Sequence, residues 1–85
     1  MSISIIANLK RVAGLELAVL FKEVSADLTK ISVRSRGGVD AAAMCAIFGG
    51  GGHIRAAGAE IQKPMDEAVK LVLATAKESI VAASP

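Results

Sequence analysis

The residues best suited to chemistry lie in one stretch, FGGGGHIRAAG, from Phe48 to Gly58. Four consecutive glycines are costly in a folded domain, because each loses more backbone entropy on folding than any other residue, about 0.5–1 kcal/mol relative to Ala. A helix commonly ends in a left-handed glycine, which accounts for one or two of them. A run of four favours a backbone that approaches a ligand closely and offers N–H groups to an anion.

Positive charge accompanies the glycines. Between residues 34 and 55, three arginines and one aspartate leave +2, which equals the net charge of the whole chain. An arginine fork suits phosphate and a serine hydroxyl adds a donor, so a strand end that reads Arg-Ser-Arg is a candidate anion site if it lies beside the glycine run. The same charges also suit the solvated edge of a strand. The residues concerned are Arg34, Ser35, Arg36, Arg55 and Asp40.

His53 is the single histidine of the chain, and it has no neighbours at metal-ligand spacing. Its residue type is compatible with an incidental or structural role, and equally with donation to a phosphate or stacking on a base. Cys45 falls in an apolar segment, where a thiol behaves as a small core residue. The carboxylates near the glycine run, Asp40 and Glu60, form no cluster typical of a hydrolytic centre.

The composition favours one small soluble domain over residues 1–85. Hydrophobic residues make up 53% of the chain but only two are aromatic, so Ala, Val, Leu and Ile must form the core. One cysteine excludes an internal disulfide and indicates a reducing compartment, for which we expect the cytoplasm. The chain shows no leader pattern and no apolar run long enough to span a membrane, so we expect no membrane association.

Hydrophobic periodicity predicts the elements of the N-terminal half. Ser4–Val12 places apolar residues at helical spacing, which predicts a short amphipathic helix ended by Gly14. Leu15–Val24 and Lys30–Arg36 alternate and predict two strands of a hairpin, with a turn at Ser25–Thr29. Ile31, Val33 and Ser35 are expected on one face of the second strand, opposite Arg34 and Arg36.

The C-terminal half predicts two helices around a third strand. Val39–Phe48 is rich in Ala and predicts a short buried helix with Asp40 in its first turn, ended by the glycine run. Ala56–Ile61 is expected to return as a strand. From Met65 onward the apolar residues recur at helical spacing after a Lys-Pro pair. The whole predicts an α+β domain, with a small mixed sheet of about three or more strands and helices packed on one face.

The centre of the chain, Ile31 to Ile61, resembles the C-terminal DHH-associated substrate-binding domain of the DHH-family phosphoesterases, in the oligoribonuclease and phosphoadenosine phosphate phosphatase-like group. The shared signature is an Arg-Ser strand end, a helix of small residues, a GGGGH loop and a following AAG. These parts occur in order as Arg34-Ser35, Val39–Phe48, Gly49–His53 and Ala56–Gly58. The match is tight in the centre and loose elsewhere.

The resemblance implies a role for each residue of the motif. Arg34 and Ser35 would contact substrate phosphate, the glycine run would supply backbone N–H groups, and His53 would contact phosphate or base, while Arg36 and Arg55 would give electrostatic support. It also implies that catalysis belongs to a separate N-terminal DHH domain that binds two manganese ions. The chain itself has no Asp-His-His motif, so we expect no cofactor here. The glycines concerned are Gly49, Gly50, Gly51 and Gly52.

We therefore expect a domain that binds a nucleotide or a short oligonucleotide through its phosphate, as part of a manganese-dependent phosphodiesterase. Two alternatives are a general single-stranded nucleic-acid-binding module and a non-catalytic interaction domain. The substrate stays open between short RNA, phosphoadenosine phosphate and a cyclic dinucleotide, as does the polarity of attack. The chain is expected to be excised from a longer polypeptide or a free-standing paralogue, and an exposed partner face predicts self-association, for instance as a homodimer.

Overall fold

The computed structural model describes residues 3–10 and 14–83. Its centre is the hairpin of β2 (Glu16–Ser25) and β3 (Leu28–Arg36), whose strands are joined by a tight turn. Alternate residues of each strand are buried, among them Leu17, Val19 and Ile31, because an antiparallel sheet covered on one side hides every second side chain. Both strands and their turn were predicted from the alternating pattern, and the structure confirms them.

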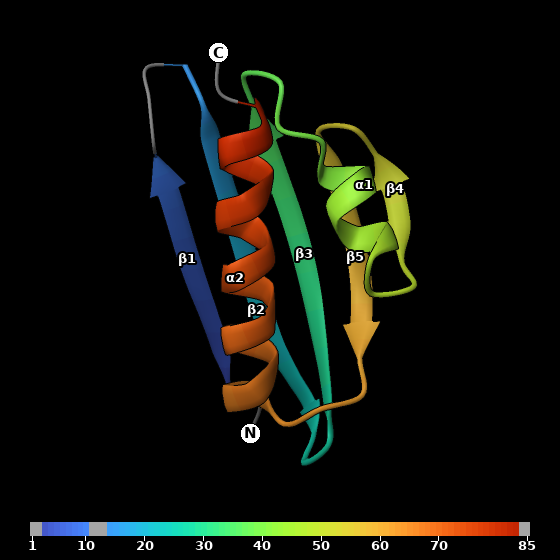
Figure 1. The fold of residues 1–85 in the computed structure, drawn as a ribbon. Coiled ribbons are helices and arrows are strands. Elements are labelled where there is room, and N and C mark those ends of the chain that lie inside the picture. Colours follow the sequence, from blue (N-terminus) through green and yellow to red (C-terminus); the bar gives the residue numbers. More distant parts are fainter. Residues whose placement is uncertain (1–2, 11–13, 84–85) are drawn as a thin grey trace.

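Five strands form one sheet in the order β1-β2-β3-β5-β4 (Figure 1). β1 (Ser4–Lys10) and β4 (Gly51–His53) are the two edges, and β5 (Ala56–Ile61) pairs with β3 as the predicted third strand. Each neighbouring pair is antiparallel. The predicted α+β class is confirmed, and the sheet is antiparallel where a mixed sheet was expected.

β1 corrects the helix predicted for Ser4–Val12. Ser4–Lys10 pairs with β2 throughout, and Ala7 and Leu9 pack against the core. Isoleucines favour a strand because their branched side chains fit a pleated surface, and so short a helix has little stability of its own. Val12, the last residue of the predicted helix, lies outside the described residues.

The long helix α2 (Met65–Ala83) lies across β2 and β3 (Figure 1). Its position is fixed at the start by Thr29, a buried residue whose hydroxyl donates to the carbonyl oxygen of Lys63 at 3.0 Å. The predicted apolar stripe is confirmed. No helix in the described part of the chain has the length and apolar character needed to cross a membrane. The residues of the stripe that are fully buried are Ala68, Val72, Ala76 and Ile80.

The short helix α1 (Ala41–Ala46) packs over β4 and β5, on the same face of the sheet as α2 (Figure 1). It is shorter than the predicted Val39–Phe48. Asp40 lies one residue before the helix instead of in its first turn, and its carboxylate accepts from the Ala43 N–H at 2.9 Å as an N-cap.

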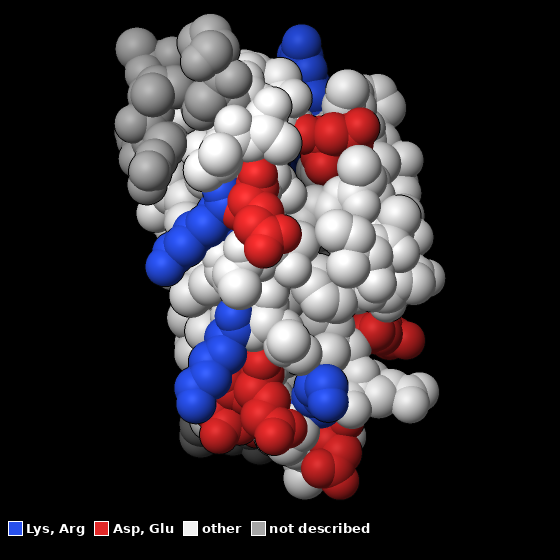
Figure 2. Space-filling view, viewed as in Figure 1, with Lys and Arg blue, Asp and Glu red and all other residues white. Residues whose placement is uncertain are grey.

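The two faces of the sheet are therefore unequal. Side chains of both signs are intermixed on the helix-covered side of the molecule (Figure 2), which offers no one-sided field for a charged ligand. On the other face, the described chain places no helix. We call this second surface the open face.

Candidate functional site

Strand pairing brings Arg34 and His53 onto the open face in a single cross-strand row. Arg34 pairs with Ala56 of β5, and Ala56 pairs in turn with His53 of β4. Directly paired residues share a face, and neighbouring strands lie about 4.8 Å apart, so the two Cα atoms are about 10 Å apart. Only the methyl group of Ala56 stands between the two polar side chains. The strand end and the glycine segment are thus adjacent, as the predicted anion site required.

His53 is exposed and one of its ring nitrogens is already occupied. Its Nδ1 accepts a hydrogen bond from the Arg55 N–H at 3.2 Å. In the neutral ring one nitrogen accepts and the other carries the proton, so this contact assigns the proton to Nε2. His53 therefore presents an N–H donor to the solvent side, where an anionic oxygen can accept it.

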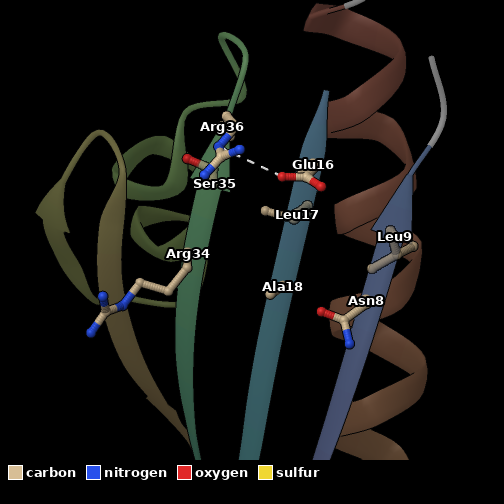
Figure 3. A pocket seen from close by; sticks show the side chains of 8 residues that line it. All are labelled: Asn8, Leu9, Glu16, Leu17, Ala18, Arg34, Ser35 and Arg36. Carbon is tan, nitrogen blue, oxygen red and sulfur yellow. Dashed lines mark ion pairs between the residues drawn. The ribbon is translucent and has the colours of Figure 1, made fainter. Parts of the chain in front are cut away.

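The two arginines of β3 differ in their surroundings. Nε of Arg36 lies 3.6 Å from Oε2 of Glu16 in an exposed ion pair, whereas the Arg34 side chain extends away from β2 on the side of β5 (Figure 3). Among the described residues, no carboxylate forms an ion pair with Arg34. Both arginines border a hollow of about 210 Å³ that also involves Asn8 and Ala18. Of these two arginines, Arg34 is the one whose guanidinium has no ion-pair partner among the described residues.

Ser35 faces the opposite way from Arg34, as the alternation predicted. Its hydroxyl donates to the Ile54 carbonyl oxygen at 3.0 Å, and its N–H donates to the Arg55 carbonyl oxygen at 3.0 Å. The Ala41 N–H also donates to the Ile54 carbonyl oxygen, at 2.7 Å. These three bonds fix the turn between β4 and β5. In this arrangement Ser35 positions the turn that carries His53, and the exposed Arg55 side chain projects from that turn.

Two glycines of the run complete the end of α1. Gly49 has a φ of 81°, and its N–H donates to the Ala46 carbonyl oxygen at 3.0 Å. The Gly50 N–H donates to the Cys45 oxygen at 2.9 Å. Since both N–H groups are engaged in capping the helix, they are not available to the anion that the sequence assigned to them.

Close packing against β5 explains why residues 50 and 52 of the run are glycines. A Cβ on Gly50 would lie 2.2 Å from the Gly58 oxygen, and one on Gly52 would lie 2.7 Å from the Ala57 Cα. Gly51 differs: a Cβ there meets nothing within 4 Å, and its φ is not positive. The fold therefore requires three of the four glycines, but it does not require Gly51.

Gly51 and Gly58 are directly paired, which places them one step along the open face from the Arg34–His53 row. Ser32 completes that second row on β3. Sequence reasoning did not identify β4 as a strand or Gly58 as part of the site. The AAG at Ala56–Gly58 was the available signal, since Ala56 and Gly58 lie on the open face and leave it without bulky side chains, while Ala57 packs against the core.

The described residues contain no group of three His, Cys, Asp or Glu side chains that could hold a metal ion. The two phenylalanines offer no stacking platform on the open face, because Phe21 is fully buried and Phe48 packs against the core. Burial also raises the pKa of the Cys45 thiol, which disfavours the nucleophilic thiolate. The exposed side chains of Arg34 and His53 offer hydrogen-bond donors to an anion, and among the described residues neither a metal site nor an activated thiol accompanies them.

Comparison with known proteins gives two findings. The sequence model of a family described as the DHHA1 domain matches residues 2–82. A 52-residue segment is 44% identical to the bifunctional oligoribonuclease and PAP phosphatase NrnA of Thermus thermophilus. That alignment covers 60% of this chain but 16% of the relative, so the chain corresponds to a small part of that protein.

Proposed function

The chain belongs to the DHHA1 domain family, and from this premise we propose that it is the substrate-binding domain of a DHH-family phosphoesterase. In this proposal the open face holds the phosphate of a nucleotide or a short oligonucleotide, with Arg34 and His53 on either side of it. The name of the Thermus relative, an oligoribonuclease and PAP phosphatase, supports a ligand of this chemical class.

One observation carries the proposal: the bare backbone at Gly51. A glycine in a strand weakens it, and neither packing nor backbone conformation demands glycine here. The position lies beside the row that holds Arg34 and His53, where a side chain would stand next to Gly58 on the open face. A ligand that lies against β4 and β5 gives a physical reason for the missing side chain.

The chemistry of the row fits a phosphate. The planar fork of Arg34 can donate two parallel hydrogen bonds to phosphate oxygens, and the Nε2–H of His53 can donate a third from the other side. Both side chains are exposed, so water competes for each bond and the isolated chain should bind weakly. A second domain that covers the open face would exclude this water and strengthen the same contacts.

For the complete protein we propose a catalytic DHH domain on the same polypeptide, which would bind manganese and supply the hydrolytic chemistry. The described residues of this chain do not fit such a metal centre, because no three possible ligands converge. Their part is to bind the phosphate, to orient the scissile bond and to limit access of water. The proposal places the protein in the cytoplasm, where short RNA and nucleotides occur.

The test is a titration of the amide resonances of the labelled 85-residue chain with AMP and with a 5′-phosphorylated dinucleotide. We expect shifts at Arg34, Gly51 and His53, and at least about 10-fold weaker binding by Arg34→Ala, because a hydrogen bond to a charged group contributes about 1.5–3 kcal/mol. Arg36→Ala is the matched control, since this arginine is engaged by Glu16, and it should change the affinity less than about 2-fold.

The proposal is wrong if millimolar ligand leaves Arg34, Gly51 and His53 unmoved in a folded sample. Equal losses from Arg34→Ala and Arg36→Ala would indicate a diffuse electrostatic surface instead of a defined site. Activity of the complete protein that is unchanged by His53→Ala would favour the interaction-domain alternative.

A further inference from the structure

A second hollow adjoins the site on the open face. It has a volume of about 530 Å³, within the range of small-molecule sites, and it lies over the part of β3 and β5 beyond the Gly51–Gly58 pair. Glycines explain its shape. Gly58 supplies a floor without a side chain, and Gly50 approaches it so closely that the wall on that side is bare backbone.

Lys30 and Glu60 stand in this hollow as a directly paired donor and acceptor. The structure records no ion pair for either side chain among the residues it describes, and both are exposed. The Gln62 amide borders the same space. An ammonium beside a carboxylate complements a molecular edge on which a hydrogen-bond acceptor stands next to a donor.

A carboxylate on a phosphate-binding face needs a reason, because it repels the ligand. Lys30 and Arg34 are four residue steps apart along β3, which places the Lys30–Glu60 row about 13 Å from the Arg34–His53 row. This exceeds the Debye length of about 8 Å at physiological salt, so Glu60 opposes a phosphate at the first row only slightly. The separation is comparable to the reach of an extended nucleotide from its phosphate to the far edge of its base.

We propose that the Lys30–Glu60 hollow is a base-recognition subsite that prefers bases with an exocyclic amino group. This inference rests on the proposed function. Adenine, guanine and cytosine each present an amino donor beside a ring or carbonyl acceptor, and Glu60 accepts from the amino group while Lys30 donates to its neighbour. Uracil also has an N–H beside a carbonyl oxygen, but this N–H lies recessed between two carbonyl oxygens. One of them can accept from Lys30, while the other faces the Glu60 carboxylate and repels it.

The experiment compares the affinities of AMP, GMP, CMP and UMP for the 85-residue chain, read from amide shifts. We expect the three amino-bearing nucleotides to bind about 10-fold more tightly than UMP, in line with one good pair of base contacts, and to shift Lys30 and Glu60 as well as Arg34 and His53. Glu60→Ala should reduce this preference to less than 2-fold. Glu78→Ala, the same change at an exposed position of α2, should leave it unchanged.

The outcomes separate the two proposals. If all four nucleotides bind equally and shift Arg34 and His53 but leave Lys30 and Glu60 unmoved, the base subsite is wrong and the phosphate site stands. A preference that survives Glu60→Ala also overturns the subsite. If none of the four binds, the proposed function fails as well. Arg34→Ala should weaken all four by the same factor and keep their ratios, because that residue contacts the phosphate that they share.

Discussion

Two adjacent glycines, Gly50 and Gly51, differ in whether the fold leaves space for a side chain. Gly50 has no space for one, since a Cβ would lie 2.2 Å from a backbone oxygen of β5. Gly51 has space on every side and an ordinary backbone conformation. The fold therefore requires glycine at position 50 but not at position 51, where a bound ligand is our proposed reason for it.

The corresponding prediction is that Gly50→Ala destabilises the chain by about 2 kcal/mol or more, because the backbone of β5 must move to relieve the overlap. Gly51→Ala should leave the free energy of unfolding unchanged or raise it by up to about 1 kcal/mol, yet weaken nucleotide binding. Urea unfolding and the AMP titration measure the two effects. A Gly51→Ala variant that binds as tightly as the parent would remove the main support for the phosphate site.

A second prediction for a single residue concerns Cys45. Its burial raises the pKa of the thiol above its ordinary value of 9.0. The folded state then holds this proton more firmly than the unfolded state, so the stabilising contribution is complete below pH 9 and is lost as the pH rises through the higher folded value. Urea unfolding between pH 8 and 10.5 should show stability falling, and the fall should be shallower in Cys45→Ala. Equal slopes of stability against pH in the parent chain and in Cys45→Ala would contradict a raised pKa of the Cys45 thiol.

The glycine run also shows what a sequence can resolve at single residues. The pattern predicted that one or two glycines end a helix, and Gly49 and Gly50 do so. The pattern also predicted a close approach to a ligand, whereas Gly50 lies against β5. The pattern by itself could not distinguish a ligand from β5. That distinction depends on contacts between segments that only the folded chain defines.

At the element scale, the turn between β4 and β5 depends on β3. Ser35 donates through its hydroxyl and its N–H to two successive carbonyl oxygens of the turn, those of Ile54 and Arg55. His53 precedes these residues, and its ring orientation is set by the Arg55 N–H. The sequence-based interpretation made Ser35 a phosphate contact, whereas its place in the fold favours a positioning role.

We therefore predict that Ser35→Ala lowers stability by about 1 kcal/mol, increases hydrogen exchange of the Ile54 and Arg55 amides in the absence of ligand, and weakens AMP binding a few-fold. Ser25→Ala is the control, because Ser25 is exposed at the end of β2, next to the β2–β3 turn and remote from the turn between β4 and β5. Faster exchange is the informative result. Weaker binding of AMP with unchanged hydrogen exchange would instead support a direct contact between Ser35 and the phosphate.

Elements with a clear period were predicted well, and those without one were not. α2 and the β2–β3 hairpin repeat their apolar residues over many positions, so a single misplaced residue does not obscure the pattern. β1 has apolar residues at adjacent positions, Ile5 and Ile6, which fit a helix as well as a strand. β4 consists of two glycines and a histidine, which have no strand propensity, and it forms only because β5 provides a partner.

At the scale of the whole molecule, the chain is a one-sided sheet. Its helices and almost all of its core lie on one face, and the open face carries the candidate site together with exposed Ile6 and Leu20. The fold class and the packing of both helices on one face were predicted from the composition and the order of elements, and the structure confirms them. The residues that share a row on the open face were not predicted, because they depend on the pairing of β4 with β5. Self-association through exposed apolar surface stays a prediction that sedimentation at several concentrations can measure.

The open face also favours the proposed nucleotide site over a general single-strand binder. A general binder needs several phosphate contacts and aromatic platforms along a groove, and neither phenylalanine reaches the open face. The candidate row has Arg34 and His53 for one phosphate, and Glu60 interrupts the positive charge further along. Such a surface gains little from each added nucleotide.

We predict that extending a 5′-phosphorylated dinucleotide to a 12-mer raises the affinity less than about 3-fold beyond the statistical gain in sites. The logarithm of the association constant should fall with the logarithm of the salt concentration at a slope of about −0.7 to −1.4, as expected for contacts to one or two phosphates. Fluorescence titration at several salt concentrations measures both. A slope steeper than about −3, with affinity rising along the strand, would instead require a cationic track that continues past Glu60, and the function would then be the binding of long single strands.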